Sequence, residues 1–146
     1  MNGIELFLNE SSAPSDYWRA IILFGRNTAT YKFALAEALL GMIESGSSRV
    51  TLEELAVPFS AHICEHLKHC DKQVTGKSSA FLDACRDFNN GKLGLAELVE
   101  ITEEKGFNNV IDAFHFVDGR NVPVHFFETD VFGSKKDLYL PMSCIR

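Results

Sequence analysis

Three histidines and a glutamate stand close together near the middle of the sequence. His62 and His66 are four residues apart, Glu65 comes directly before His66, and His69 follows three residues later. Residues four apart share one face of a helix, so such a histidine pair can hold one metal ion. The string from His62 to His66 also fits an H-x-x-E-H pattern in which the histidines bind zinc and the glutamate activates a water. One alternative is therefore a small zinc-dependent hydrolase, with His62, His66 and His69 as candidate metal ligands.

A catalytic zinc ion needs a third protein ligand from another element. With about 100° of rotation per residue in a helix, His66 is expected within the apolar stripe of its helix and His62 at the edge of that stripe. Glu65 then points about 100° away from His66. A histidine hydrogen-bonded at the margin of the core, with no cofactor, is the competing interpretation. The candidates for the third ligand are Glu97, Glu100 and Glu103.

The most basic local stretch follows the histidines and contains Lys68, Lys72 and Lys77. The segment from Lys72 to Ser78 ends like a phosphate-binding P-loop, but Asp71 stands where that motif needs glycine. An aspartate there would repel the phosphate, so a loop followed by a helix cap is the better interpretation. The lysines can contact a phosphate or form a solvated rim.

Composition limits the classes of protein to which the chain can belong. Its 146 residues are 46% hydrophobic and 23% charged, which is typical of one globular domain. The formal net charge of −6 argues against binding nucleic acid unaided, because phosphates are neutralised by clustered Lys and Arg. Four cysteines are too few for a disulfide framework. With no signal peptide and no long apolar run, we expect a cytoplasmic protein with no membrane partner.

The hydrophobic pattern predicts a mainly α fold of about six helices with a small C-terminal β-hairpin. The helices begin near residues 15, 27, 51, 78, 95 and 108 and end near residues 25, 44, 70, 89, 106 and 117. Thr51 and Glu54 form a capping-box pattern before the third helix. Pro58 either kinks that helix or begins a new one. The chain then divides into an N-terminal segment, 1–14, a helical domain, 15–117, and a hairpin with the C-terminal segment, 118–146.

The hairpin is expected from an alternating strand over 122–127 and a returning strand over 137–140, joined by a turn-rich link over 130–136. An isolated hairpin is marginally stable in water, so this one must pack on the helices or on something outside the chain. Because Arg146 follows the last apolar residues without a polar tail, we expect the chain to be a fragment of a longer protein.

Phenylalanines gather in the last third of the sequence. They either form the core between the last helix and the hairpin or contribute to an interface with a missing domain, a partner or a second copy of the chain. A homo-oligomeric interaction protein is therefore a further alternative. The candidate interface residues are Phe116, Phe126 and Phe127.

Three stretches carry a family resemblance: residues 17–27 with 30–36, then 64–69 with 71–73, and finally 106–115. They read YWRAIILFGRN with TYKFALA, CEHLKH with DKQ, and GFNNVIDAFH. Together, over roughly residues 15–140, they resemble the N-terminal region of bacterial proteins that carry an HNH endonuclease domain further along the chain.

The resemblance implies a non-catalytic helical recognition or assembly module, in a setting of defence against foreign DNA. The residues of the HNH motif are absent, so the nuclease domain would lie beyond Arg146 or in a partner protein, and nucleic acid would be bound only through that assembly. Alternatively, Arg26 and Lys32 bond to acidic residues and Tyr31 packs in the core. The candidate nucleic-acid or partner contacts are Arg19, Arg26, Asn27, Tyr31, Lys32, Lys68 and Lys72.

Overall fold

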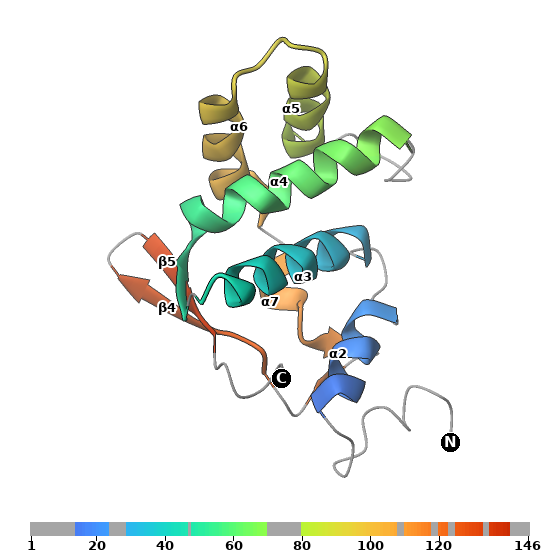
Figure 1. Cartoon of the computed structure of the whole chain (residues 1–146), viewed down its shortest axis with the longest axis vertical. Helices are drawn as coiled ribbons and strands as arrows, with labels where there is room; N and C mark the ends of the chain where they lie inside the picture. Colours follow the sequence, from blue (N-terminus) through green and yellow to red (C-terminus); the bar gives the residue numbers. More distant parts are fainter. Residues whose placement is uncertain are drawn as a thin grey trace.

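Helix α4, Leu52–His69, is the longest described helix and runs across the middle of the fold (Figure 1). The Glu54 N–H donates to the Thr51 hydroxyl at 3.1 Å, and the Thr51 N–H donates to the Glu54 carboxylate at 3.2 Å. The predicted capping box is therefore confirmed. Pro58 lies inside α4, so the helix does not end before the proline. The computed structural model describes residues 14–23, 29–46, 48–69, 80–107, 110–117, 120–122, 125–132 and 135–140.

Five other α-helices are found among the described residues; three of them, α3, α5 and α6, pack on α4, and the other two, α2 and α7, pack on α3. In Figure 1, α3 lies along one side of α4, whereas α5 and α6 lie on the other. The predicted fold class, mainly α with a small β part, is confirmed. Within the described ranges, no helix has both the length and the apolar character needed to cross a membrane. The helices are α2, Pro14–Leu23, α3, Ala29–Glu44, α5, Ala80–Asn89, α6, Leu95–Ile101, and α7, Val110–Ala113.

Aromatic rings join these helices at the centre of the core. Phe59 of α4 is fully buried, and its ring centroid lies 5.9 Å from that of Phe81 on α5 and 4.7 Å from that of Phe107. Tyr31 of α3 completes the cluster, 6.3 Å from Phe59. Buried rings remove large apolar areas from water, so this cluster is a main source of the free energy that holds α3, α4 and α5 together.

A π-helical turn, η1, Thr102–Gly106, continues α6 and ends at the predicted glycine. A Cβ at Gly106 would lie 3.0 Å from the Thr102 side chain and 3.2 Å from the Phe81 ring, so a larger residue would have to displace these neighbours by a few tenths of an ångström. The Thr102 hydroxyl is buried and donates to the Leu98 carbonyl at 2.7 Å.

A three-stranded antiparallel sheet lies beside the start of α4 (Figure 1). Its order is β1, Arg49–Thr51, then β5, Lys135–Tyr139, then β4, Glu128–Phe132. Val50 pairs with Leu138, and Arg49 forms an ion pair of 2.6 Å with Asp137. The hairpin is thus not isolated, because β1 supplies a third strand that the sequence pattern did not predict.

The predicted returning strand over 137–140 coincides with β5 at residues 137–139, but the other predicted positions in the hairpin are wrong. The described residues among 122–127 lie outside the strands, and β4 with the start of β5 occupies most of the segment expected to be a link. The apolar residues of 122–127 belong to the core and not to a strand, since Val122, Phe126 and Phe127 are all buried. The Val122 N–H donates to the His115 carbonyl at 2.8 Å, so its partner lies outside the three-stranded sheet.

The predicted last helix is too long. Helix α7 ends at Ala113, and Phe116–Val117 form a short strand, β2, paired with β3, Arg120–Asn121. Phe116 and Val117 pair with β3, and the Phe116 carbonyl accepts a hydrogen bond from the buried Lys32 ammonium at 2.8 Å. Strand pairing therefore takes the place of the predicted last helical turn.

Candidate functional site

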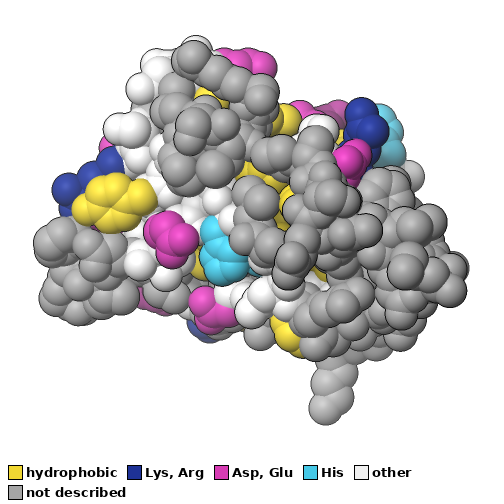
Figure 2. Space-filling view, turned by 90° about the horizontal axis from the view of Figure 1, so that it is seen from below, with side chains coloured by type: hydrophobic (Ala, Val, Ile, Leu, Met, Phe, Trp, Pro, Cys, Tyr) yellow, Lys and Arg dark blue, Asp and Glu magenta, His cyan; other side chains and the backbone are white. Residues whose placement is uncertain are grey.

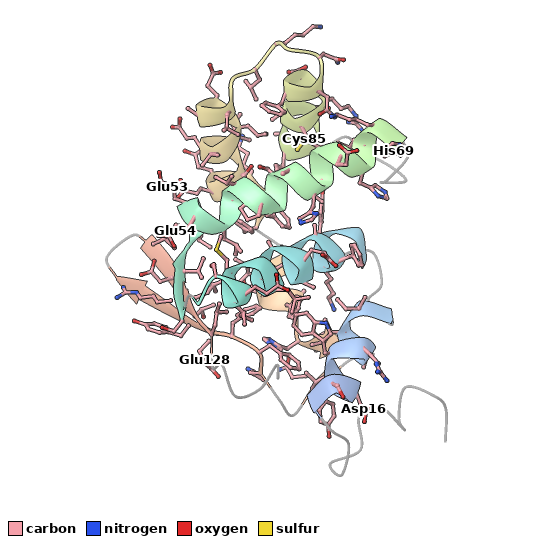
Figure 3. All side chains as sticks on the ribbon, in the orientation of Figure 1. Asp16, Glu53, Glu54, His69, Cys85 and Glu128 are labelled. Carbon is pink, nitrogen blue, oxygen red and sulfur yellow. The ribbon has the colours of Figure 1, made fainter. Side chains whose placement is uncertain are left out.

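The three clustered histidines line one groove at the C-terminal half of α4. We name it the histidine groove; its volume is about 270 Å³. Its apolar wall includes Phe33, whose side chain is 53% exposed. Figure 3 labels His69 at the opposite end of α4 from Glu53 and Glu54, so the helix carries acids in its first turn and bases in its last, as its dipole favours. The groove is lined by Phe33, Ala34, His62, Ile63, Glu65, His66 and His69.

The placement predicted for His66 is wrong, because both His62 and His66 are exposed. In the C-terminal half of α4 the buried residues are Ile63, Cys64 and Leu67. This buried arc is rotated away from His66, toward the side where α5 packs against Cys64. The apolar stripe residues Ile63 and Leu67 are buried, and the buried arc extends from them toward Cys64 and not toward His66.

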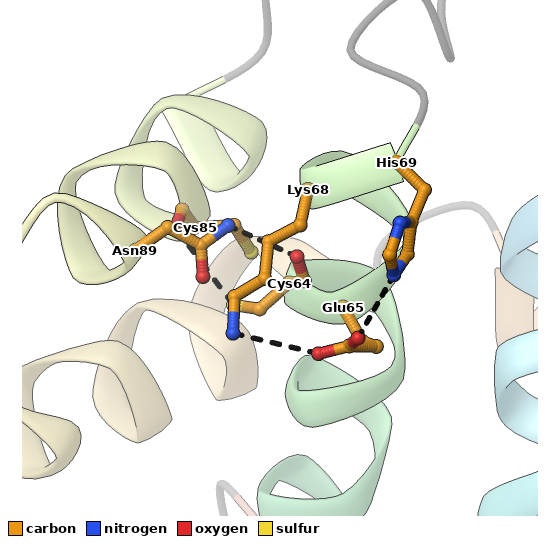
Figure 4. Close-up of polar contacts among 6 residues, drawn as sticks. All are labelled: Cys64, Glu65, Lys68, His69, Cys85 and Asn89. Atoms are coloured by element: carbon orange, nitrogen blue, oxygen red, sulfur yellow. Dashed lines mark hydrogen bonds and ion pairs between the residues drawn. The ribbon is translucent and has the colours of Figure 1, made fainter.

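Glu65 is held by two neighbours on its own helix (Figure 4). Its carboxylate lies 3.1 Å from His69 Nε2 and 3.4 Å from Lys68 Nζ. The hydrogen bond with His69 and then that with Lys68 lower the pKa of the Glu65 carboxyl below its usual range. An exposed carboxylate held in this way is a weaker general base than a hydrolase glutamate with a raised pKa.

The ligand set expected for a catalytic zinc ion does not converge. No three side chains of His, Cys, Asp or Glu come together among the residues that the structure describes in a way that could hold a metal ion. The carboxylates considered as third ligands lie on α6 and η1 and form no such group with His62 and His66. His62 and His66 remain as a pair.

A second groove lies between the ends of α4 and α5. We name it the α4–α5 groove; its volume is about 490 Å³. Lys68 is exposed there beside Arg86, which forms an ion pair of 3.2 Å with Asp83. The Asn89 amide donates to the Cys64 carbonyl at 2.9 Å, a bond that ties α5 to α4 (Figure 4). The groove is lined by Leu67, Lys68, Arg86, Asn89 and Asn90.

Of the basic residues predicted here, Lys68 lies in the α4–α5 groove and Lys72 lies outside the described residues. Sequence reasoning missed Arg86, because one arginine on an amphipathic helix resembles any solvated charge. Only the packing of α5 on α4 brings Arg86 and Lys68 to the same groove.

Two buried cysteines face each other across the α4–α5 contact. Cys64 Sγ lies 3.8 Å from the Cys85 carbonyl oxygen, and both residues carry free thiols. The contact with Cys64 and then burial raise the pKa of Cys85 far above its usual range. Cys85 therefore stays a thiol and packs as a small apolar residue, as its place on a buried stripe predicts.

A buried polar cluster is formed by Lys32 of α3 and by His115, which follows α7. Lys32 is 2% exposed, its ammonium donates to the Phe116 carbonyl, and burial lowers its pKa. His115 is 7% exposed, and its Nε2 accepts a hydrogen bond from the Phe126 N–H at 2.9 Å. Burial, then His125 and Lys32, lower the pKa of His115 to about 3, so its ring is neutral. Lys32, predicted to contact a partner, is thus part of the core.

The remaining predicted contacts divide between surface and core. Arg19 is exposed on α2, whereas Tyr31 packs against Phe59 and Phe81, the structural alternative for this residue. Arg26 and Asn27 lie outside the described residues. In Figure 2, the Lys and Arg side chains drawn on this face stand apart at its edges and form no continuous basic surface.

The three candidate interface phenylalanines separate in the same way. Phe126 and Phe127 are 1% and 3% exposed, with Phe126 in edge contact with Trp18 and Phe127 beside Phe114. They are core residues, and of the three only Phe116, at 48% exposure, presents its ring to solvent.

Comparison with protein-family models, with curated proteins and with solved structures finds no match to this chain.

Proposed function

We propose that this chain is a non-catalytic, mainly helical recognition and assembly module of a bacterial HNH-nuclease-type protein that acts in defence against foreign DNA. The proposal joins the resemblance of the three sequence stretches to one observation. That observation is the α4–α5 groove, where Lys68 and Arg86 come from different helices to a single concave surface with two asparagines. Two cations and two amides on a concave surface suit an anionic partner surface.

The state of the reactive side chains supports a role in binding over a role in catalysis. Lys32 and His115 are buried and hydrogen-bonded to backbone groups, and Glu65 is paired with Lys68 and His69. A general base needs an accessible group with a pKa near the working pH. None of these three residues meets both conditions, which also disfavours the hydrolase alternative that uses Glu65.

Net charge defines the kind of partner. The chain carries 20 acidic and 14 basic side chains, so its overall field repels a nucleic-acid backbone. The proposed direct partner is therefore the nuclease domain, in the same native chain or in a second protein, through carboxylates that can pair with the two cations of the α4–α5 groove. Nucleic acid and the nuclease metal ion are then bound by that domain.

The first experiment is to read the native gene and its neighbours for an HNH motif. A motif in frame or in the adjacent gene supports the proposal, and its absence from both overturns it. The nuclease domain is then purified and titrated with this chain by calorimetry. Lys68→Glu is expected to weaken binding at least tenfold, because it reverses a charge in the groove.

Lys105→Glu is the matched control, since it reverses the charge of an exposed lysine on η1, outside the groove. Equal losses for both variants would show a general charge effect and contradict a specific groove. Plasmid cleavage by the isolated chain with Mg²⁺, Mn²⁺ or Zn²⁺ is expected to be absent. Cleavage that persists after repeated purification would overturn a non-catalytic role.

A further inference from the structure

His62 and His66 present ligand atoms that the rest of the described structure does not use. Both are exposed and line the histidine groove, one turn apart on α4. Neither has a hydrogen-bond or ion-pair partner among the described residues, whereas His69 is paired with Glu65. Imidazole nitrogen is a good ligand for Zn²⁺, Ni²⁺ and Cu²⁺, and a poor one for Mg²⁺ and Ca²⁺.

The backbone beneath the pair is fixed. Ile63 is 0% exposed and Leu67 is 5% exposed, and both pack in the core directly beside the histidines. A separation of four residues corresponds to about 6 Å of helix rise and places the two rings on one face. Two imidazoles that each reach a metal at about 2.1 Å can close on one ion across that gap. Binding therefore orders only two side chains.

His69 cannot join the same ion with good geometry. It is seven residues from His62, which is about 10.5 Å of helix rise. The geometry therefore yields a two-histidine site, in agreement with the absence of a three-ligand group among the described residues. The other coordination positions remain for water or small ligands in the groove.

We infer that His62 and His66 form a bidentate site for one divalent late-transition-metal ion of the Zn²⁺, Ni²⁺ and Cu²⁺ class in the histidine groove. The site is distinct from the α4–α5 groove. The inference does not depend on the proposed assembly role, and it assigns no hydrolytic activity to Glu65.

The experiment titrates untagged, chelator-treated chain with ZnCl₂, NiCl₂, CuCl₂ and MgCl₂ by calorimetry. We expect one ion per chain, the tightest binding for Cu²⁺, and no binding of Mg²⁺. His62→Ala and His66→Ala should each weaken Ni²⁺ binding by tenfold or more, because one ligand cannot chelate. His69→Ala should change it less than threefold, and the exposed His125→Ala is the matched control elsewhere on the surface.

Three outcomes would overturn the inference: unchanged Ni²⁺ affinity in His62→Ala and His66→Ala, an equal loss in His69→Ala, or Mg²⁺ binding as tight as that of Ni²⁺. A measurement on the unmodified chain makes the test independent of variant folding. Substoichiometric Cu²⁺ should broaden the ring NMR signals of His62 and His66 before those of His125. Broadening of His125 first would place the ion elsewhere and contradict the assignment.

Discussion

The histidines of α4 and His115 are the same side chain in opposite surroundings. His62 and His66 stand in solvent on a rigid helix, with no bonded partner among the described residues. His115 is buried, stacked on His125 at 4.4 Å between ring centroids, and hydrogen-bonded to the Phe126 backbone. Whether a histidine can bind a ligand therefore depends on whether its ring nitrogens already have partners within the protein. In the core, histidine is structural; on α4 it keeps its capacity to bind a ligand.

The largest expected effect is the pH dependence that His115 gives to the free energy of unfolding. The pKa of His115 falls from 6.5 to about 3 on folding, so between these values the unfolded chain binds more protons than the native one. Stability is then complete above about pH 6.5 and is lost as the pH falls toward 3. The loss from this residue is on the order of 5 kcal/mol at about 1.4 kcal/mol per pH unit.

The measurement is urea unfolding of the wild type and of His115→Gln from pH 7 to pH 4. The variant does not titrate at this position, so its stability should fall less steeply over this interval. Parallel curves would show that His115 is accessible to protons in the native state, which would break the contrast with α4.

Truncation of the buried ring is the next largest effect. His115→Ala removes the acceptor of the Phe126 N–H and leaves a cavity among Phe114, Phe126 and Phe127. We expect a loss of about 2–4 kcal/mol, from the cavity and the unsatisfied donor together. Urea unfolding at pH 7 measures it, with His125→Ala as the control for loss of the stacked partner alone. A loss below about 1 kcal/mol would contradict a structural role.

Local patterns in the sequence predict much of the helical fold, because they act over three or four residues. The Thr51 and Glu54 capping box, the helix through Phe59 and the glycine at the end of η1 all follow from such patterns. Strand β1 does not, because its three residues acquire a partner only from β5, at the other end of the chain. Pairing over that distance leaves no local signal.

The candidate sites divide for the same reason. The spacing of His62 and His66 predicts that they share a face, and the structure brings both to one groove. The apolar pattern marks Ile63 and Leu67 as buried, but how far the buried arc extends to either side depends on where α5 packs, and the helix pattern alone does not contain that information. Lys32 shows the limit most clearly: its partner is the backbone carbonyl of Phe116, and no side chain marks that contact in the sequence.

Lys32 provides the third test of the comparison, with a smaller expected effect. Lys32→Ala leaves the Phe116 carbonyl without its donor and removes a buried aliphatic stem, which should cost about 1–3 kcal/mol. Lys32→Met keeps most of the stem and should lose less. Urea midpoints of both variants give the answer. Unchanged midpoints would mean that the ammonium is solvated, and the role of Lys32 as a partner contact would return.

The smallest effect is expected from His66→Ala in metal-free buffer. The side chain is exposed, so its removal creates no cavity and leaves no described group without a partner. The unfolding free energy should stay within about 0.5 kcal/mol of wild type, as at other surface positions. Urea unfolding with a chelator present measures it, and His62→Ala should match it. A loss as large as that of His115→Ala would mean that His66 packs within the apolar stripe, as the averaged helix pattern predicts, and the pair on α4 would no longer be available as ligands.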